Sequence, residues 1–164
     1  DTALHFVFDA VGDGICSSIF KGTPSQLEIL HQNQYPDSIG LFYSAVTEYC
    51  GFNINEGEFK LMALAAYGQP LHEDFLLENV IKLKEPSIKL NLDWFNFHKS
   101  VTNSYSVLFE EKFGPAANQN DLTINAERFQ IFADIAASTQ RVTEKIICEI
   151  ISWGVRKTGI QNTS

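Results

Sequence analysis

The sequence has no long hydrophobic run, no excess of basic residues and no closely spaced cysteine pair. Its apolar runs all fall short of the roughly 20 residues that a membrane-spanning helix needs, and residues 1–10 lack the basic start of a secretory signal peptide. The net charge of −8 argues against nucleic acid or a membrane surface as a partner, although a nucleotide needs only local donors. Cys16, Cys50 and Cys148 are odd in number and far apart, so we expect thiols in a reducing, cytoplasmic environment.

The remaining composition is that of an ordinary folded domain. The chain has 164 residues, of which 45% are hydrophobic, and this is enough for one domain with a substantial core. It contains no internal repeat and no low-complexity tract. Because it opens directly on a strand-like segment, we expect residues 1–164 to be a single partial domain, an internal segment of a longer chain.

β-forming residues near the start of the chain predict a small sheet of strands joined by short turns. The predicted strands cover residues 3–8, 15–21 and 26–31. A further strand is predicted at 88–92, where Ile88, Leu90 and Leu92 alternate with polar residues.

Helical spacing of apolar residues predicts helices at 39–49, 55–68, 72–83, 105–113 and from 125 or 126 to near Gly159. Asp37 or Ser38 is expected to cap the first of them, and Gly40 near its start indicates a close contact, since glycine is a poor helix former. The last helix is apolar over most of its circumference, which is typical of a central helix packed against a sheet or other helices. The elements together predict a mixed α/β fold, with a β-hairpin sheet, packed helices and one long C-terminal helix.

The segment 55–68, NEGEFKLMALAAYG, carries charge where a core-filling helix would not. Asn55 suits an N-cap, Glu58 can reach back to the amide of Asn55, and Gly68 suits the end of the helix. Its apolar stripe consists of Phe59, Met62, Ala63 and Ala66. Glu58 and Lys60 fit either a solvent-facing ion pair on an amphipathic helix or a binding site, and the segment alone leaves both open.

The turn at residues 9–14 joins the first two strands and contains Asp9, Gly12, Asp13 and Gly14. A short acidic turn with glycines can present backbone N–H groups to a phosphate, or aim a carboxylate at a metal ion. Gly and Asp are also the ordinary residues of a hairpin turn. The turn by itself therefore leaves both interpretations open.

Three blocks of sequence, taken together, resemble one family. They are FVFDAVGDG at 6–14, YPDSIGLFYSAVTEYCGFNINEGEFKLMALAAYG at 35–68 and DIAASTQ at 134–140. With these blocks the chain resembles the N-terminal catalytic domain of the O-carbamoyltransferases of nodulation-factor and antibiotic biosynthesis. The second block is the specific one, through the spacing of SIGLFYSA, GF, GEFK and YG.

The resemblance implies a fragment of an actin/Hsp70-like (ribonuclease H-like) ATPase domain, similar to the catalytic subunit of tRNA threonylcarbamoyladenosine synthase. In such proteins carbamoyl phosphate and ATP give carbamoyladenylate, and the carbamoyl group then passes to a hydroxyl-bearing small-molecule acceptor. The family also uses a divalent metal, Fe or Mg here. We therefore expect ATP and a divalent metal as cofactors.

The resemblance also implies roles for particular residues. Asp9, at the end of the first strand, matches the family's metal-binding Asp. The phosphate-facing loop of the family corresponds to the turn with Gly12, Asp13 and Gly14. The block that meets the nucleoside corresponds to Glu58, Lys60 and Gly68.

The chain departs from the family pattern at several positions. Ala10 stands where glycine is usual, and Ala63 and Ala66 stand where Gly and Pro are common, so a methyl group at Ala10 could crowd a phosphate. A His-rich metal motif before the first strand and a Gly-Gly nucleotide motif after the long helix belong to the family but not to residues 1–164. We therefore expect the remainder of the parent chain to complete the site, and the fragment alone to be inactive. Two alternatives stay open: a non-catalytic nucleotide-binding or interaction module, and a sugar-kinase-like phosphotransferase.

Overall fold

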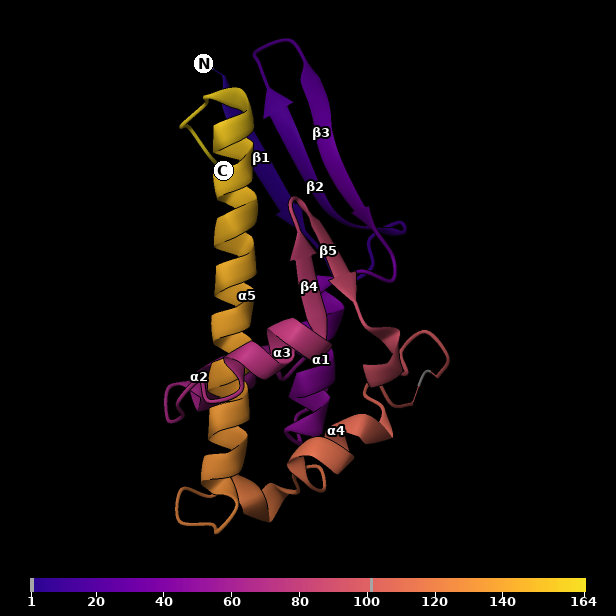
Figure 1. Ribbon diagram of the computed structural model, residues 1–164, viewed down its shortest axis with the longest axis vertical. Helices are drawn as coiled ribbons and strands as arrows, with labels where there is room; N and C mark the ends of the chain where they lie inside the picture. Colours follow the sequence, from indigo (N-terminus) through magenta and orange to yellow (C-terminus); the bar gives the residue numbers. More distant parts are fainter. Residues whose placement is uncertain (1, 101) are drawn as a thin grey trace.

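The computed structural model describes residues 2–100 and 102–164, and it has the predicted mixed α/β structure (Figure 1). The main sheet has the order β1-β2-β3 and is antiparallel, with strands β1 (Ala3–Phe8), β2 (Ile15–Gly22) and β3 (Leu27–Gln34). A separate antiparallel hairpin consists of β4 (Ile81–Lys84) and β5 (Ser87–Leu90). The helices are α1 (Ile39–Tyr49), α2 (Glu58–Ala65), α3 (Glu73–Asn79), α4 (Val107–Phe113) and α5 (Phe129–Thr158).

Helix α5 is the axis of the molecule and, with its 30 residues, is about 45 Å long. In Figure 1 it runs along the whole structure, with the main sheet beside its C-terminal half and α1, α2 and α3 beside its N-terminal half. Its buried face includes Phe132, Ala133, Ala136, Val142, Ile146 and Ile150 at helical spacing. Gly159 ends the helix with a φ of 71°, a left-handed conformation that suits glycine, so the predicted end of this helix is confirmed.

A glycine sets the distance between the main sheet and α5. A Cβ atom added at Gly154 would lie 2.9 Å from the ring of Phe6 and 3.4 Å from a methyl group of Leu4, which is fully buried. Beside it, the rings of Trp153 and His31 meet edge to face with centroids 6.2 Å apart. The small residue at 154 therefore lets β1 pack directly against the helix.

An aromatic cluster around Tyr49 joins α1, α4 and α5 at the other end of the molecule. The buried ring of Tyr49 lies with its centroid 5.4 to 6.4 Å from those of Tyr105, Phe109, Phe113 and Phe132. Its hydroxyl donates a hydrogen bond of 2.7 Å to the carbonyl oxygen of Gly114. The polar tip of this core residue is therefore satisfied.

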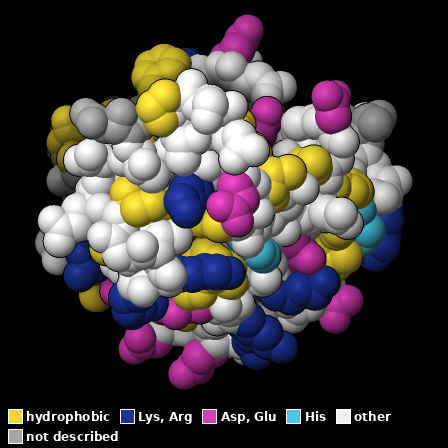
Figure 2. Space-filling view, turned by 90° about the horizontal axis from the view of Figure 1, so that it is seen from above, with side chains coloured by type: hydrophobic (Ala, Val, Ile, Leu, Met, Phe, Trp, Pro, Cys, Tyr) yellow, Lys and Arg dark blue, Asp and Glu magenta, His cyan; other side chains and the backbone are white. Residues whose placement is uncertain are grey.

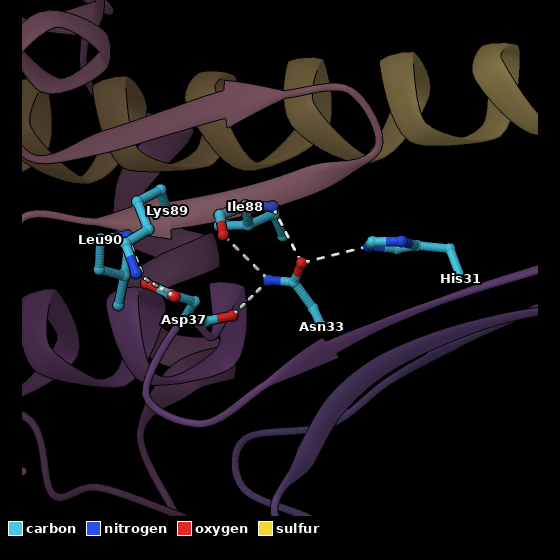
Figure 3. Close-up of polar contacts among 6 residues, drawn as sticks. All are labelled: His31, Asn33, Asp37, Ile88, Lys89 and Leu90. Carbon is cyan, nitrogen blue, oxygen red and sulfur yellow. Dashed lines mark hydrogen bonds and ion pairs between the residues drawn. The ribbon is translucent and has the colours of Figure 1, made fainter.

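Asn33, at the end of β3, links the main sheet to the β4-β5 hairpin (Figure 3). Its buried amide group accepts a hydrogen bond from the N–H of Ile88 at 3.1 Å and donates one to the carbonyl oxygen of Ile88 at 3.1 Å. The same Nδ2 donates to the carbonyl oxygen of Asp37 at 2.7 Å, and the Asp37 carboxylate pairs with Lys89 and the Leu90 amide. The Asn33 side chain thus satisfies the N–H and carbonyl groups of Ile88 at the outer edge of β5, as a neighbouring strand would.

Replacing Asn33 by alanine is expected to destabilise the chain by about 3 kcal/mol, because two buried backbone groups of Ile88 lose their partners. Urea unfolding followed by circular dichroism measures the change. Gln34→Ala, at the exposed neighbouring position, is the matched control and should change the free energy of unfolding by less than about 0.5 kcal/mol. Equal effects of the two substitutions would contradict this role of Asn33.

The predicted helix at 72–83 is wrong beyond residue 79. Helix α3 ends at Asn79, and the next residues form β4, which pairs Ile81 with Leu90 and Leu83 with Ile88. The apolar residues of 81–90 fit both a helical and an alternating spacing. The hairpin buries one face with Ile81, Ile88 and Leu90 and leaves the lysines of the other face exposed, and this alternation favours the strand.

The predicted helix at 55–68 is too long, and its apolar stripe faces the wrong way. Helix α2 covers only Glu58–Ala65, with Gly57 at the N-cap position, and Asn55 has a φ of 68°, so it is not the cap. Glu58 does accept a hydrogen bond from the Asn55 amide, as predicted, at 3.1 Å. The residues that α2 buries are Leu61 and Leu64, whereas the predicted stripe of Phe59, Met62, Ala63 and Ala66 is exposed.

Other boundaries move by a few residues. Strand β3 extends to Gln34, and α4 begins at Val107 behind Ser106, whose side chain accepts a hydrogen bond from the Leu108 amide. Helix α5 begins at Phe129, later than predicted, and a short 3₁₀ helix at Gln119–Leu122 lies within the loop before it. Leu92 lies in a second 3₁₀ helix, Leu92–Trp94, and not in β5.

The surface mixes charges of both signs. Seen from the end where the β2-β3 turn and the end of α5 lie, Lys and Arg side chains alternate with Asp, Glu and hydrophobic side chains (Figure 2). Cys16 and Cys50 are buried and Cys148 is exposed, all as free thiols. Within residues 2–100 and 102–164, every helix is too short or too polar to cross a membrane.

Candidate functional site

The β1-β2 turn is shaped by two glycines with positive φ. Gly12 has a φ of 51°, and a Cβ atom there would lie 2.6 Å from the carbonyl oxygen of Ile15, so this position needs glycine. Gly14 donates a hydrogen bond to Val11 and accepts one from the amide of Tyr35, which ties the turn to the end of β3. The amides of the exposed residues 11–13 have no hydrogen-bond partner in the described part of the chain. Such a run of free amides is the arrangement that binds anions.

Asp9 lies at the end of β1 with its side chain over this turn. Its Oδ1 accepts a hydrogen bond from the Ala10 amide at 2.6 Å, and its Oδ2 would lie 3.6 Å from a Cβ atom at Gly12. The backbone of Asp9 is held on both sides, because its N–H donates to Cys16 and its carbonyl oxygen accepts from the hydroxyl of Ser38. The exposed carboxylate is therefore well placed to contribute one ligand to a cation.

The N-terminus of α1 lies directly against the turn. Ser38 is the N-cap, as predicted, and its hydroxyl accepts a hydrogen bond from the Leu41 amide at 3.1 Å while donating to Asp9. A Cβ atom at Gly40 would lie 2.9 Å from the Cα atom of Ala10, so the predicted close contact at Gly40 is confirmed. The first turn of α1 carries no acidic residue, so its partial positive charge adds to that of the free amides.

Glu58 lies against the same face of α1, one helical turn further along. The hydroxyl of Ser44, four residues after Gly40, donates a hydrogen bond of 2.7 Å to its carboxylate, so about 6 Å of helix separates the two contacts. Partial burial acts to raise the pKa of Glu58, but the hydrogen bonds from Ser44 and the amides of Asn55 and Gly57 outweigh it and lower the pKa. The stabilisation that ionised Glu58 provides is therefore present above the ordinary carboxyl range and is lost as the pH falls through the lowered pKa.

Lys60 and Gly68 have other neighbours. The ammonium group of Lys60 lies 5.8 Å from the ring centroid of Phe59, and the residue borders a hollow of about 260 Å³ near Gln119. Gly68 packs against α5 so closely that a Cβ atom there would overlap the carbonyl oxygen of Ala133. The structure therefore does not bring Glu58, Lys60 and Gly68 together. It does place Glu58 and the turn with Asp9 against the same face of α1.

A groove of about 480 Å³ between α2 and α5 was missed from the sequence. One wall carries Met62, Ala65, Ala66, Gly68 and Pro70, and the other carries Ala137, Gln140, Arg141 and Glu144. Tyr43 of α1 donates a hydrogen bond of 2.9 Å to Gln140, and burial raises the pKa of Tyr43 to about 12, so it stays protonated. The small residues of segment 55–68 were the only signal of such a close approach.

The described residues bring together no group of three His, Cys, Asp or Glu side chains that could hold a metal ion. Asp9, with Asp13 in the same turn, can supply at most part of a coordination shell. A metal ion bound here would need further ligands from outside residues 1–164.

Comparison with known proteins decides the family. The model of the family described as "Carbamoyltransferase N-terminus" matches residues 1–164, the whole chain. The chain belongs to the carbamoyltransferase N-terminus family. The resemblance inferred from the three sequence blocks is thereby confirmed.

Relatives of this carbamoyltransferase N-terminus chain are considerably longer proteins. The uncharacterized protein sll1178 of Synechocystis sp. is 34% identical over 163 residues, 99% of this chain and 26% of its own length. Nodulation protein NolNO of Sinorhizobium fredii is 24% identical over 166 residues, all of this chain and 22% of its own length. The uncharacterized protein MJ1051 of Methanocaldococcus jannaschii is 35% identical over 83 residues, 51% of this chain and 16% of its own length. The chain therefore spans about a quarter or less of these relatives.

Proposed function

We propose that the chain is part of the catalytic domain of an O-carbamoyltransferase. Hydrolysis of carbamoyl phosphate would give carbamate and phosphate, and the carbamate oxygen would displace pyrophosphate from the α-phosphorus of ATP to give carbamoyladenylate. The carbamoyl group would then pass to the hydroxyl of a small-molecule acceptor, with release of AMP. The observation that carries the proposal is the match of the family model to all 164 residues. The proposal puts the protein in the cytoplasm, where free thiols such as Cys148 stay reduced.

The proposal extends to an ATPase-type domain with its site at the β1-β2 turn, and the direction of the chain at residues 162–164 supports this. These residues run parallel to β1: Leu4 donates to Asn162, Ser164 donates to Leu4, and Phe6 donates to Ser164, each at 2.8 Å. In sheets with parallel strands, ligands bind outside the carboxyl ends of the strands. Asp9 follows the carboxyl end of β1. A site at the β1-β2 turn is therefore where an actin/Hsp70-like domain would be expected to bind its ligand.

In this proposal each part of the turn has its own task. The free amides of residues 11–13 and the N-terminus of α1 bind phosphate oxygens, and the Asp9 carboxylate is one ligand of a divalent Mg or Fe ion. The metal ion, when bound, offsets negative charge on the phosphate oxygens. Glu58 and Lys60 contact the nucleoside, for which Glu58 exchanges one of its present hydrogen bonds for a ribose hydroxyl.

An assay without an acceptor tests the proposal on the full-length parent protein. We expect pyrophosphate release from ATP only when carbamoyl phosphate is also present, because the adenylate forms before the transfer step. With an acceptor added, ADP together with a phosphorylated acceptor would indicate the sugar-kinase-like alternative. Absence of any nucleotide turnover, with Mg²⁺ or with Fe²⁺, would contradict the proposal and favour a non-catalytic module.

A further inference from the structure

Helix α2 presents an apolar face to solvent. Phe59, Met62, Ala63 and Ala66, here called the α2 stripe, follow the i, i+3, i+4, i+7 spacing of one helix face. Phe59 is 63% exposed and Met62 is 56% exposed, although the opposite face with Leu61 and Leu64 is buried. The helix therefore has two apolar faces, an inner one that packs in the core and an outer one that is exposed to solvent.

Further exposed hydrophobic residues follow the helix in the chain. Tyr67 and Leu71, in the segment that follows α2, are 57% and 69% exposed. Four of the twelve large exposed hydrophobic residues of the described chain thus fall within the 13 residues from 59 to 71. Exposed hydrophobic residues scattered singly are ordinary, but a concentration of this kind marks an interaction surface.

A hollow lies alongside the stripe. Met62 and Ala66 of the α2 stripe also form one edge of the 480 Å³ groove between α2 and α5. The far edge carries Arg141 and Glu144, so a charged rim of both signs borders an apolar ridge and its groove. An apolar centre with a polar rim is the usual anatomy of a protein–protein contact.

We propose that the α2 stripe and the groove beside it are the docking surface for another segment of the same polypeptide, outside residues 1–164. The inference rests on the proposed function in one respect, namely that the chain is part of a longer carbamoyltransferase. About three quarters of sll1178 and of NolNO lie outside the region that matches this chain, so such a protein has ample chain to cover the surface. Interfaces between parts of one chain resemble protein–protein contacts, so a surface with this anatomy suits such packing.

The charge of the chain disfavours a second copy as the occupant. Residues 1–164 carry a net charge of −8, so two copies of this region repel each other. A segment of the same polypeptide is instead held near the surface by its covalent connection, so its effective concentration is high whatever the protein concentration.

Photo-crosslinking in the full-length parent protein tests the proposal without reference to activity. Phe59 is replaced by p-benzoylphenylalanine, an aromatic side chain of similar shape, and Glu78 on the exposed surface of α3 is replaced in the matched control. We expect light to join position 59 to a peptide from outside residues 1–164, within one chain, with a yield several times that at position 78. Mixing ¹⁴N-labelled and ¹⁵N-labelled protein separates crosslinks within a chain from those between chains.

Three results would overturn the proposal: a yield at position 59 no higher than at position 78, crosslinks confined to residues 1–164, or crosslinks between chains.

Thermal melting of the parent gives a second measurement. Phe59→Ala should lower the melting temperature by several degrees if a segment packs on the stripe, whereas Val107→Ala, at a position 62% exposed, should leave it nearly unchanged. Equal shifts for the two variants would contradict docking. Pyrophosphate release by the parent together with a failed crosslink would reject the docking surface and leave the proposed function standing.

Discussion

Replacing Asp9 by asparagine is expected to reduce carbamoyl-phosphate-dependent pyrophosphate release by the full-length parent protein by about a thousandfold. Asparagine keeps an oxygen that can accept the hydrogen bond from the Ala10 amide, so the turn keeps its shape. What it loses is the negative charge that would hold a divalent cation beside the phosphates. Purified variant and unaltered parent are compared at saturating ATP and a fixed metal concentration.

The control for this substitution is Asp93→Asn. Asp93 is an exposed carboxylate in the 3₁₀ helix Leu92–Trp94, outside the elements that form the candidate site. Its replacement should leave pyrophosphate release unchanged. If Asp9→Asn also retained full activity, Asp9 would not be a metal ligand and the site would have to lie elsewhere in the family domain.

Replacing Gly68 by alanine is expected to lower the free energy of unfolding by about 3 kcal/mol. The φ of Gly68 is not in the left-handed region, so the backbone itself accepts alanine. The added methyl group would overlap the carbonyl oxygen of Ala133, and backbone atoms of α5 cannot turn aside as a side chain can. Helix α2 would have to move away from α5, which weakens the packing of Leu61 and Leu64.

Gly159→Ala is the matched control, because it separates the steric effect from the conformational one. Gly159 has a φ of 71° but has open space around it, so alanine there brings only the strain of a left-handed residue, about 1 to 2 kcal/mol. Urea unfolding of both variants measures the difference. A smaller effect at Gly68 than at Gly159 would mean that α2 is not held tightly against α5.

Local signals predicted those elements whose residues interact with near neighbours. The three strands of the main sheet, the cap at Ser38, the close contact at Gly40 and the end of α5 at Gly159 all depend on sequence patterns a few residues long. Helical periodicity also showed which residues of α2 share a face. It could not show which face turns inward, because Leu61 and Leu64 on one side and Phe59 and Met62 on the other are both apolar.

Contacts between distant residues were beyond the reach of the sequence. Asn33 pairs with Ile88 across 55 positions, and its identity as an asparagine in a strand does not reveal its partner. The contact of Gly68 with Ala133 of α5 is another example. The resemblance to the family suggested that Gly68 meets a nucleoside, whereas the structure shows that close packing against α5 also requires glycine there. For Glu58, the sequence indicated the hydrogen bond to Asn55 but not the one to Ser44.

The pairing of β1 with residues 162–164 has a consequence for the order in which the protein is made. The outer edge of β1 finds its partner only when the ribosome has synthesised about 160 further residues, which takes on the order of 10 s or more. During that interval β1 and β2 can already form a hairpin, but one side of the hairpin is an open strand edge, the kind that joins with other chains. The segment after α5 thus pairs with the free edge of β1 late in synthesis. We expect aggregation of nascent chains that stall before residues 162–164 are made.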